Sequence, residues 1–451
     1  MTHSDDQAAL SPGIGSHAPL ETPQHARLGH QRWKTVGTMY LGYAMFMVLR
    51  MIPTVTGAAM RKDPALEIDL EVWGRILSIG TCGAIVGKFV GGWAADAFGG
   101  KRTFSVGLLC ASVFVGLFAA STEIWMFQVT FFITLLAKSA GWPAMAKIIP
   151  NWFASDEYGR VWGVLSTSSR VGTLIATFCL GALLTVLPWR SILVVSAVAG
   201  GLTAVVFFVL LKERPRRTPA ASEFTTNTGL ASAAPHALDG LGFGHTLQRF
   251  ASSRQFWLIT GSLMGLTILW DFLLMVPMYL EDTLSLPMAR ASMAASAFPF
   301  GSLISVLCGG YVFDRISRKT AARVFGLLLS LATACIGTFL VLPEIGLSTT
   351  AATYLSLVLL FVFGVCVSPC YYIPMSVFSI EFGGPRSGFL ISLLDALAFG
   401  ASALFYYHAG GWAQQDWGLF LSVLLVVCIW SLCMTILFLR GEAPHQTAMQ
   451  S

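Results

Sequence analysis

The chain has 451 residues, of which 55% are hydrophobic and only 11% are charged. Its mean hydropathy of +0.70 is far above that of water-soluble globular proteins. This composition excludes a soluble enzyme, and it predicts an all-α protein whose chain crosses the membrane many times.

Twelve apolar segments are each long enough to cross about 30 Å of hydrocarbon as a helix. The basic residues indicate their orientation, because placing both termini in the cytosol leaves most of the Lys and Arg side chains on the cytoplasmic side. The net charge of +5 therefore reflects membrane topology, and no nucleic-acid partner is expected. We predict a multi-pass protein of the cytoplasmic (inner) membrane with spans at residues 36–60, 74–98, 103–122, 124–149, 161–187, 190–211, 256–280, 289–313, 320–342, 350–378, 387–409 and 418–439.

These spans form two groups of six, separated by a polar segment. The segment begins with KERPRRTPAASEFTTNTG and lacks a sustained apolar period, so we expect a cytoplasmic linker there. The organisation that we predict is a disordered cytoplasmic N-terminal tail, an N-terminal six-helix bundle, the linker, a C-terminal six-helix bundle and a C-terminal tail, at residues 1–34, 35–211, 212–255, 256–440 and 441–451.

The two groups of spans contain related sequences. GGWAADAFGGKR lies between spans two and three, and GGYVFDRISRK lies between spans eight and nine. In both, an aspartate follows a glycine by four residues, and a basic pair comes shortly afterwards. Such repetition indicates two structurally related halves. The repeated positions are Gly92, Asp96, Lys101 and Arg102 in the first copy and Gly310, Asp314, Arg318 and Lys319 in the second.

This repeated motif resembles the signature of the major facilitator superfamily, and the resemblance extends over roughly residues 30–440. It implies a secondary transporter in which two pseudo-symmetric six-helix bundles rock about a central substrate site. The motif itself would form a conformational latch. Its glycine would permit close helix packing, its aspartate would accept hydrogen bonds from a neighbouring helix end, and its basic residues would hold the cytoplasmic face together.

A single arginine, Arg50, stands in the apolar stretch YAMFMVLRMIPTV of the first span. A guanidinium near the middle of the membrane costs roughly 2.5 kcal/mol or more, and it cannot escape this cost by losing its proton. The side chain must therefore face the interior of the bundle. There it either pairs with a buried acid or receives an anionic substrate.

Several further motifs resemble those of the organophosphate:phosphate antiporters. They are Arg32-Trp33, Tyr43, Arg50, Lys88 in GKFVGG, Gly141-Trp142-Pro143, Asn151-Trp152-Phe153, Gly159-Arg160 and Val171-Gly172. The resemblance implies exchange or uptake of a phosphate-bearing or similar anion, with Arg50 as the main ligand and Lys88 assisting. The sequence departs from that group at Leu269, where the antiporters carry a second arginine on helix seven. A phosphate clamp of two arginines at these positions is therefore not expected.

Other side chains within the spans complete the candidate substrate site. Lys138 stands where this group usually carries glutamine, so it adds a positive charge near the expected cavity. Arg170, in STSSRVG, either binds substrate or neutralises a buried acid. The aromatic residues Tyr43, Trp142 and Trp270 either line the cavity or pack in the core.

Two carboxylates lie within spans seven and eleven. Asp271 in LTILWDFLLM and Asp395 in ISLLDALAFG either pair with the buried cations or carry the protons that drive transport. An acid paired with a buried cation would hold the empty site closed until an anion displaces it. Lys88 lies only eight residues before Asp96, so it belongs either to the substrate site or to the latch.

The sequence contains no enzyme motif such as Walker A or HExxH, and its nine cysteines form no CxxC pair, so no cofactor and no metal site are expected. We predict a monomeric secondary transporter that moves a small organic anion, such as a phosphate ester or phosphonate, with protons or phosphate as the coupling ion. Two alternatives remain open. PAMAKIIPNWF at residues 143–153 is equally similar to the anion:cation symporters, which favours a proton-coupled carboxylate symporter. The antiporter group also includes receptors with a transporter fold, which favours a membrane sensor.

Overall fold

The computed structural model describes residues 23–153, 157–212, 243–313, 317–383 and 387–441, and nearly all of them are helical. In these ranges, twelve helical segments are long and apolar enough to cross a membrane. The predicted fold class, an all-α membrane protein with twelve spans, is confirmed. Each predicted span corresponds to an observed one, with ends that differ by a few residues.

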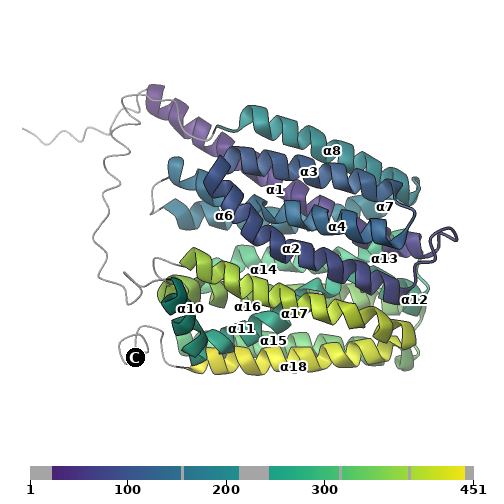
Figure 1. The fold of residues 1–451 in the computed structure, drawn as a ribbon. Helices are drawn as coiled ribbons and strands as arrows, with labels where there is room; N and C mark the ends of the chain where they lie inside the picture. Colours follow the sequence, from purple (N-terminus) through teal and green to yellow (C-terminus); the bar gives the residue numbers. More distant parts are fainter. Residues whose placement is uncertain (1–22, 154–156, 213–242, 314–316, 384–386, 442–451) are drawn as a thin grey trace, which may run out of the picture.

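The helices form two halves, which Figure 1 shows as two layers of roughly parallel helices. The N-terminal half consists of α1 (Pro23–Arg61), α2 (Leu70–Phe98), α3 (Gly100–Ala120), α4 (Ile124–Ser139), α5 (Gly141–Ile148), α6 (Tyr158–Ile175), α7 (Gly181–Leu183) and α8 (Trp189–Leu210). The C-terminal half consists of α10 (Phe243–Ser252), α11 (Arg254–Asp271), α12 (Val276–Leu284), α13 (Met288–Ala295), α14 (Ala297–Phe313), α15 (Arg318–Val341), α16 (Thr349–Gly383), α17 (Ser387–Gln415) and α18 (Trp417–Arg440). The halves meet mainly where α2 packs on α17 and where α6 packs on α14.

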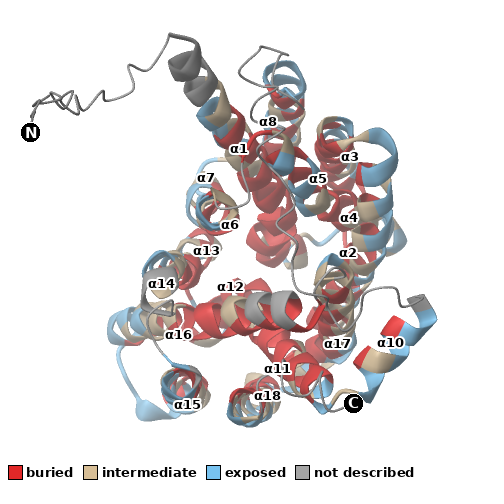
Figure 2. Cartoon of the chain, turned by 90° about the vertical axis from the view of Figure 1, so that its left-hand side faces the viewer, coloured by how far each residue is buried: buried red, intermediate tan, exposed pale blue. Residues whose placement is uncertain are grey.

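The outer surface of the bundle is apolar. On α8, the exposed residues Val194, Val198, Leu202 and Val205 recur at the spacing of one helical face. Figure 2 shows the helices nearly end-on, with many buried faces turned toward the inside of the bundle and exposed faces at the rim. In a membrane such a rim contacts lipid, which solvates apolar side chains but not polar ones.

Three spans that carry predicted site residues are interrupted inside the bundle. Helix α4 ends one residue after Lys138, and α6 passes into a π-helical turn at Ala176–Leu180. Helix α11 ends at Asp271 and is followed by a 3₁₀ turn at Phe272–Leu274. Irregular backbone at membrane depth is tolerated where it is buried in protein or lines a cavity. These breaks therefore fit a polar site between the halves.

Close packing within the N-terminal half depends on glycines of α2. A Cβ atom at Gly83 would lie 2.1 Å from the carbonyl oxygen of Phe132, and one at Gly87 would lie 2.3 Å from that of Leu136. Only residues without a side chain allow α2 to approach α4 this closely. The same contact fixes the part of α4 that carries Lys138.

Helix α1 begins and α18 ends at the same end of the bundle, here called the terminal end; the opposite end, where the chain turns from α1 into α2, is called the far end (Figure 1). Because α1 begins at Pro23, residues 23–34 are helical, whereas we expected them in a disordered tail. Residues 213–242 of the predicted linker, and tail residues 1–22 and 442–451, lie outside the described residues. The last part of the predicted linker region contains α10.

Candidate functional site: a charged centre between the halves

Arg50 is paired with a carboxylate of the other half. Its Nη2 atom lies 2.6 Å from Oδ1 of Asp271, and the two residues are only 8% and 2% exposed. Ser402 on α17 donates a hydrogen bond of 2.9 Å from its Oγ to Oδ2 of Asp271. Both carboxylate oxygens therefore have partners, which offsets the cost of removing the two charges from water.

The position of Asp271 explains how the membrane interior tolerates Arg50. Sequence alone left open whether this arginine pairs with an acid or receives a substrate, and in this structure it pairs with an acid at the end of α11. Leu269, which stands where the antiporters carry their second arginine, is completely buried. Helix seven therefore presents a negative charge to Arg50, two residues beyond the position where that group presents a positive one.

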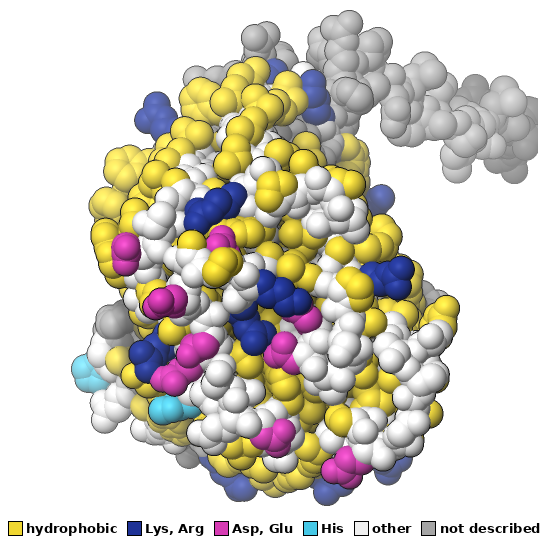
Figure 3. All heavy atoms as spheres, turned by 90° about the vertical axis from the view of Figure 1, so that its right-hand side faces the viewer, with side chains coloured by type: hydrophobic (Ala, Val, Ile, Leu, Met, Phe, Trp, Pro, Cys, Tyr) yellow, Lys and Arg dark blue, Asp and Glu magenta, His cyan; other side chains and the backbone are white. Residues whose placement is uncertain are grey.

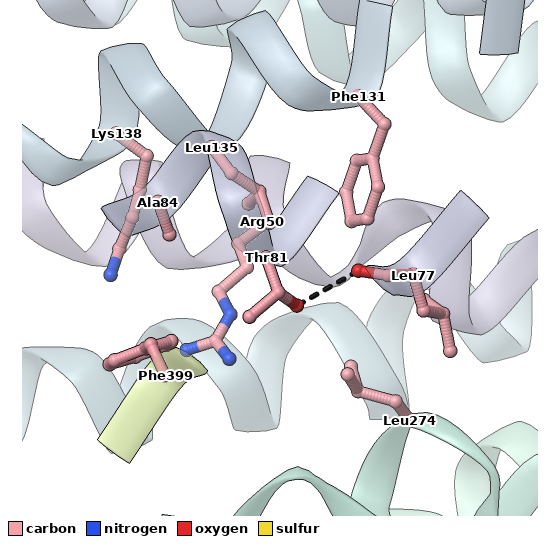
Figure 4. Close-up of a pocket in the computed structure, with 9 residues that line it drawn as sticks. All are labelled: Arg50, Leu77, Thr81, Ala84, Phe131, Leu135, Lys138, Leu274 and Phe399. Atoms are coloured by element: carbon pink, nitrogen blue, oxygen red, sulfur yellow. Dashed lines mark hydrogen bonds between the residues drawn. The ribbon is translucent and has the colours of Figure 1, made fainter. Parts of the chain in front are cut away.

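Two pockets meet at Arg50. The first has Arg50, Thr81 and Lys138 as polar lining, among apolar side chains that include Phe131 and Phe399. Figure 4 shows Arg50 and Lys138 extending from the N-terminal half toward Phe399. The second is lined by Arg50, Asp271, Thr173 and Trp270 together with apolar side chains. The Arg50–Asp271 ion pair thus lies where two small pockets between the halves meet.

Lys138 brings a second positive charge to the first pocket. It is half-buried near the end of α4, and no hydrogen bond or ion pair joins its ammonium group to any residue that the structure describes. Its Nζ atom lies 6.0 Å from the centroid of the Tyr43 ring. In its protonated form, an amine without a partner in a largely apolar pocket would favour the binding of an anion.

Lys88 lies close to this centre but lines neither pocket. Its Nζ atom is 2.5 Å from Oδ2 of Asp395 on α17, and it stands 4.7 Å from the centroid of the Phe399 ring. The hydroxyl of Tyr371 also approaches Asp395, at 3.4 Å. The structure therefore places Lys88 in a contact between the halves, and Asp395 is its partner.

Arg170 is more deeply buried than any of these cations, with 1% of its surface exposed. Its Nη1 atom donates hydrogen bonds to the carbonyl oxygen of Ser166 and to Oγ of Ser169, both within α6. Its Nε and Nη2 atoms have no hydrogen-bond partner among the described residues. The guanidinium carbon lies 4.0 Å from the ring centroid of Tyr372 and 5.2 Å from that of Trp270. Of the two roles that the sequence left open, neutralising an acid finds no support in this arrangement.

The predicted aromatic residues occupy different surroundings. Trp270 lines the second pocket. Tyr43 is buried, and its ring meets Trp142 edge-on at 5.5 Å between centroids. Trp142 in turn lies 4.5 Å from Trp162 of α6, and neither Tyr43 nor Trp142 lines the two pockets described above. These two rings support the helices that carry Lys138 and Arg50.

The predicted latch is only partly described. Asp96, which is exposed, pairs with Lys147 at 2.6 Å, and this lysine lies in the last turn of α5. Lys101 stands 4.6 Å from the ring centroid of Phe208 on α8. Arg102 is exposed. The contacts of the first copy that the structure describes therefore stay within the N-terminal half.

One expectation about the latch is wrong. We expected Gly92 to permit close helix packing, but a Cβ atom there would meet nothing within 4 Å. The neighbouring Gly91 makes the close contact, since its Cβ would lie 2.6 Å from Cα of Ala140. In the second copy, Gly310 lies in α14 and Arg318 and Lys319 open α15, whereas Asp314 falls outside the described residues.

Several polar contacts were missed at the sequence level. Two are at the far end, where Arg61 pairs with Asp282 at 3.2 Å and Lys62 pairs with Glu281. Arg61 is the last residue of α1 and Lys62 follows it, and both partners lie in α12, so these contacts join the halves. One signal was present in the sequence: Arg61 and Asp282 are 221 residues apart, as are Arg50 and Asp271. An equal separation is expected where two repeats place helices one and seven opposite each other.

The comparison with known families identifies this architecture. The sequence profile of the Major Facilitator Superfamily matches residues 36–406. The chain belongs to this superfamily. The predicted resemblance is thereby confirmed, as is the prediction of a membrane transport protein that is not an enzyme.

Individual relatives are more distant. The chain is 25% identical to the membrane sensor protein UhpC of Salmonella typhimurium, over 96% of this chain and 98% of that protein. It is 24% identical to the probable galactarate/D-glucarate transporter GudP of Bacillus subtilis, over 65% of this chain and 67% of the other. It is also 24% identical to a probable hexose phosphate transport protein of Chlamydia trachomatis, over 66% of this chain and 68% of that protein.

Solved structures share the fold. A bacterial homolog of the human lysosomal transporter Spinster, in an inward-facing and unoccupied conformation, superposes with a TM-score of 0.69, at 13% identity, over 91% of this chain and 97% of that one. A D-xylose-proton symporter superposes with a TM-score of 0.65, also at 13% identity, over 92% of this chain and 99% of that one.

Proposed function

We propose that the protein is a secondary transporter that moves a small organic anion by alternating access, with Arg50 as the main anion ligand. The observation that supports this most is the buried ion pair between Arg50 and Asp271, because it joins the two halves at a point where two pockets meet. In the absence of substrate, the carboxylate of Asp271 takes the place of the substrate anion.

Electrostatic exchange explains how binding would be coupled to movement. Removing one partner of a buried ion pair costs about 3–5 kcal/mol, because the other charge is left uncompensated. An anion that reaches Arg50 replaces Asp271 as its partner, so the charge of Arg50 stays compensated while Asp271 loses its cation. Asp271 keeps its hydrogen bond from Ser402 within the C-terminal half. The halves then lose their central link and can separate.

Lys138 would draw the anion to this position. It lines the same pocket as Arg50 and has no acidic partner among the described residues. Lys88 is paired with Asp395, so its contribution would follow only after that contact breaks.

The relatives suggest which class of anion the protein would carry. A phosphate ester or phosphonate fits the likeness to the hexose phosphate transport protein, and a sugar acid fits the likeness to the galactarate/D-glucarate transporter.

The coupling ion depends on Asp271. Once Arg50 leaves, Asp271 is a buried charge that must gain either a proton or a new cation. Proton uptake there would give symport, and return of Arg50 with a second anion, such as phosphate, would give exchange. We place the terminal end of the bundle in the cytoplasm, as the distribution of basic residues favours.

The decisive experiment compares thermal stabilisation of the purified protein by glucose 6-phosphate, glucarate, glucuronate and neutral glucose. A bound anion should raise the melting temperature of the parent and of Arg75→Gln, an exposed cation on α2, but not that of Arg50→Gln. Stabilisation by neutral glucose that is independent of Arg50 would show that this arginine is only a structural partner of Asp271.

A membrane sensor is a second candidate, because the match to UhpC covers nearly the whole chain, whereas the matches to the two transporters cover about two thirds. Uptake into proteoliposomes separates the two. A transporter should accumulate the stabilising anion under an inward proton gradient or against internal phosphate, whereas a sensor should bind the same anion without accumulating it.

A further inference from the structure

The positive charges at the centre of the bundle outnumber the negative ones. Four basic side chains lie in the middle of the N-terminal spans, and the structure describes acidic partners for Arg50 and Lys88 only. Lys138 and Arg170 remain without a carboxylate among the described residues. Arg170 in particular cannot lose its proton, and an uncompensated cation inside a membrane protein is costly, which points to a negative charge that the described residues do not supply.

Arg170 is deeply buried and faces the C-terminal half of the bundle. It is 99% buried, and the aromatic rings beside its guanidinium belong to the other half, to Trp270 of α11 and Tyr372 of α16. Such rings hold the plane of the guanidinium but accept no conventional hydrogen bond from its edge. Nε and Nη2 are therefore left as oriented donors without acceptors among the described residues.

The second pocket is lined by neighbours of this arginine but not by the arginine itself. Thr173, one helical turn beyond Arg170 on α6, lines the pocket, and so does Trp270, which contacts the guanidinium. Arg50 and Asp271 line the same pocket. Trp270 thus touches both the space next to Arg50 and the guanidinium of Arg170, within the same interface between the halves.

We infer that Arg170 forms a second anion subsite, and that the substrate carries an anionic group at each of two ends, as a sugar diacid or a phosphorylated sugar acid does. The inference rests on the proposed function. One end replaces Asp271 at Arg50 with help from Lys138, and the other end accepts hydrogen bonds from Nε and Nη2 of Arg170. Because the subsite lies between α6 and rings of the C-terminal half, only a two-ended anion contacts both halves at two points.

Matched probes test this assignment in the full-length protein. Glucarate and gluconate have the same carbon chain, but gluconate carries a hydroxymethyl group where glucarate carries its second carboxylate; 6-phosphogluconate and sorbitol 6-phosphate, both open-chain, form a second such pair. Affinities measured by thermal shift or calorimetry should favour the two-ended member of at least one pair by roughly tenfold or more, the scale of a hydrogen bond to a charged group.

Arg170→Gln should abolish this preference while changing the affinity for the one-ended member less than threefold. Arg170→Lys, which keeps the charge but lacks the planar fork, should keep part of the preference and controls for loss of folding. Equal affinity of the parent for both members of each pair, or an equal loss of both in Arg170→Gln, would overturn the second subsite. If no anion binds, or if binding does not depend on Arg50, then the proposed function itself has failed.

Discussion

Two ion pairs on α1 have similar geometry but different surroundings. Arg50 and Arg61 each pair with an aspartate 221 residues further along the chain, and the two arginines are 11 residues apart, which is about three helical turns. Asp271 in the inner pair is 2% exposed, whereas the side chains of Arg61 and Asp282 in the outer pair are 21% and 29% exposed. The repeat thus supplies two equivalent ion pairs between the halves, and burial decides how much each ion pair contributes to stability.

The far end is held by helix packing as well as by charge. A Cβ atom at Gly410 of α17 would lie 2.0 Å from the carbonyl oxygen of Leu70, and one at Gly74 would lie 2.7 Å from that of Tyr406. Gln414 accepts a hydrogen bond of 3.0 Å from the backbone of Leu70. Figure 3 shows this face, where basic and acidic side chains lie close together across its middle.

The ion pairs described at the terminal end do not join the halves. The ion pairs that the structure describes there, Arg32 with Glu157 and Asp96 with Lys147, both lie within the N-terminal half. Among the described residues, the links between the halves therefore run from Lys88 and Asp395 through the centre to the far end. This distribution fits a state whose far end is closed.

The inner pair should give the largest effect when it is broken. Asp271→Ala leaves the charge of Arg50 buried and uncompensated, so the free energy of unfolding should fall by about 3–5 kcal/mol. The double variant Arg50→Met with Asp271→Ala should recover much of this loss, because no charge is left unpaired. Denaturation of the purified variants measures both values, and a loss below about 1 kcal/mol in the single variant would mean that water reaches the pair.

Packing at the far end should give an effect of intermediate size. Gly410→Ala forces α2 and α17 apart, at a cost of about 1–3 kcal/mol, and it should lengthen the distance between spin labels at positions 65 and 285. Gly411→Ala is the matched control, because its nearest neighbour is 4.0 Å away. Unchanged distances in Gly410→Ala would mean that this contact does not hold the far end closed.

The outer pair should give the smallest effect. A double-mutant cycle of Arg61→Ala and Asp282→Ala should yield a coupling energy of about 0.2–1 kcal/mol, because both side chains are partly exposed and screened by salt. The exposed pair of Arg75 with Glu71, within α2, provides the reference cycle. A coupling energy well above the reference, at the level expected for the inner pair, would contradict the distinction drawn from burial.

Sequence predicts the parts of this structure that depend on local composition. The spans follow from apolar segments of sufficient length, and the inward orientation of Arg50 follows from the cost of its charge in lipid. The identity of each acidic partner does not follow, because Asp271 and Asp395 both lie inside the spans, and only the packing of α11 and α17 assigns one to Arg50 and the other to Lys88.

Sequence patterns also do not predict which of two adjacent residues on a helix makes a packing contact. Gly91 and Gly92 are adjacent and identical in type, yet only Gly91 faces Ala140. Lys147 was not recognised as the partner of Asp96, since about fifty residues separate them and only the fold brings α2 and α5 together. Polar function in this protein is thus set by which face of a helix a residue occupies, and that depends on contacts between distant segments.

The unpaired cations at the centre have a further consequence, in terms of voltage. Moving one elementary charge across a membrane potential of 100 mV changes the free energy by about 2.3 kcal/mol. Arg170 cannot lose its proton, so the empty site carries at least its uncompensated charge, and we expect reorientation of the empty protein to be sensitive to the potential. A bound anion offsets this positive charge, and the loaded protein would then respond less to voltage.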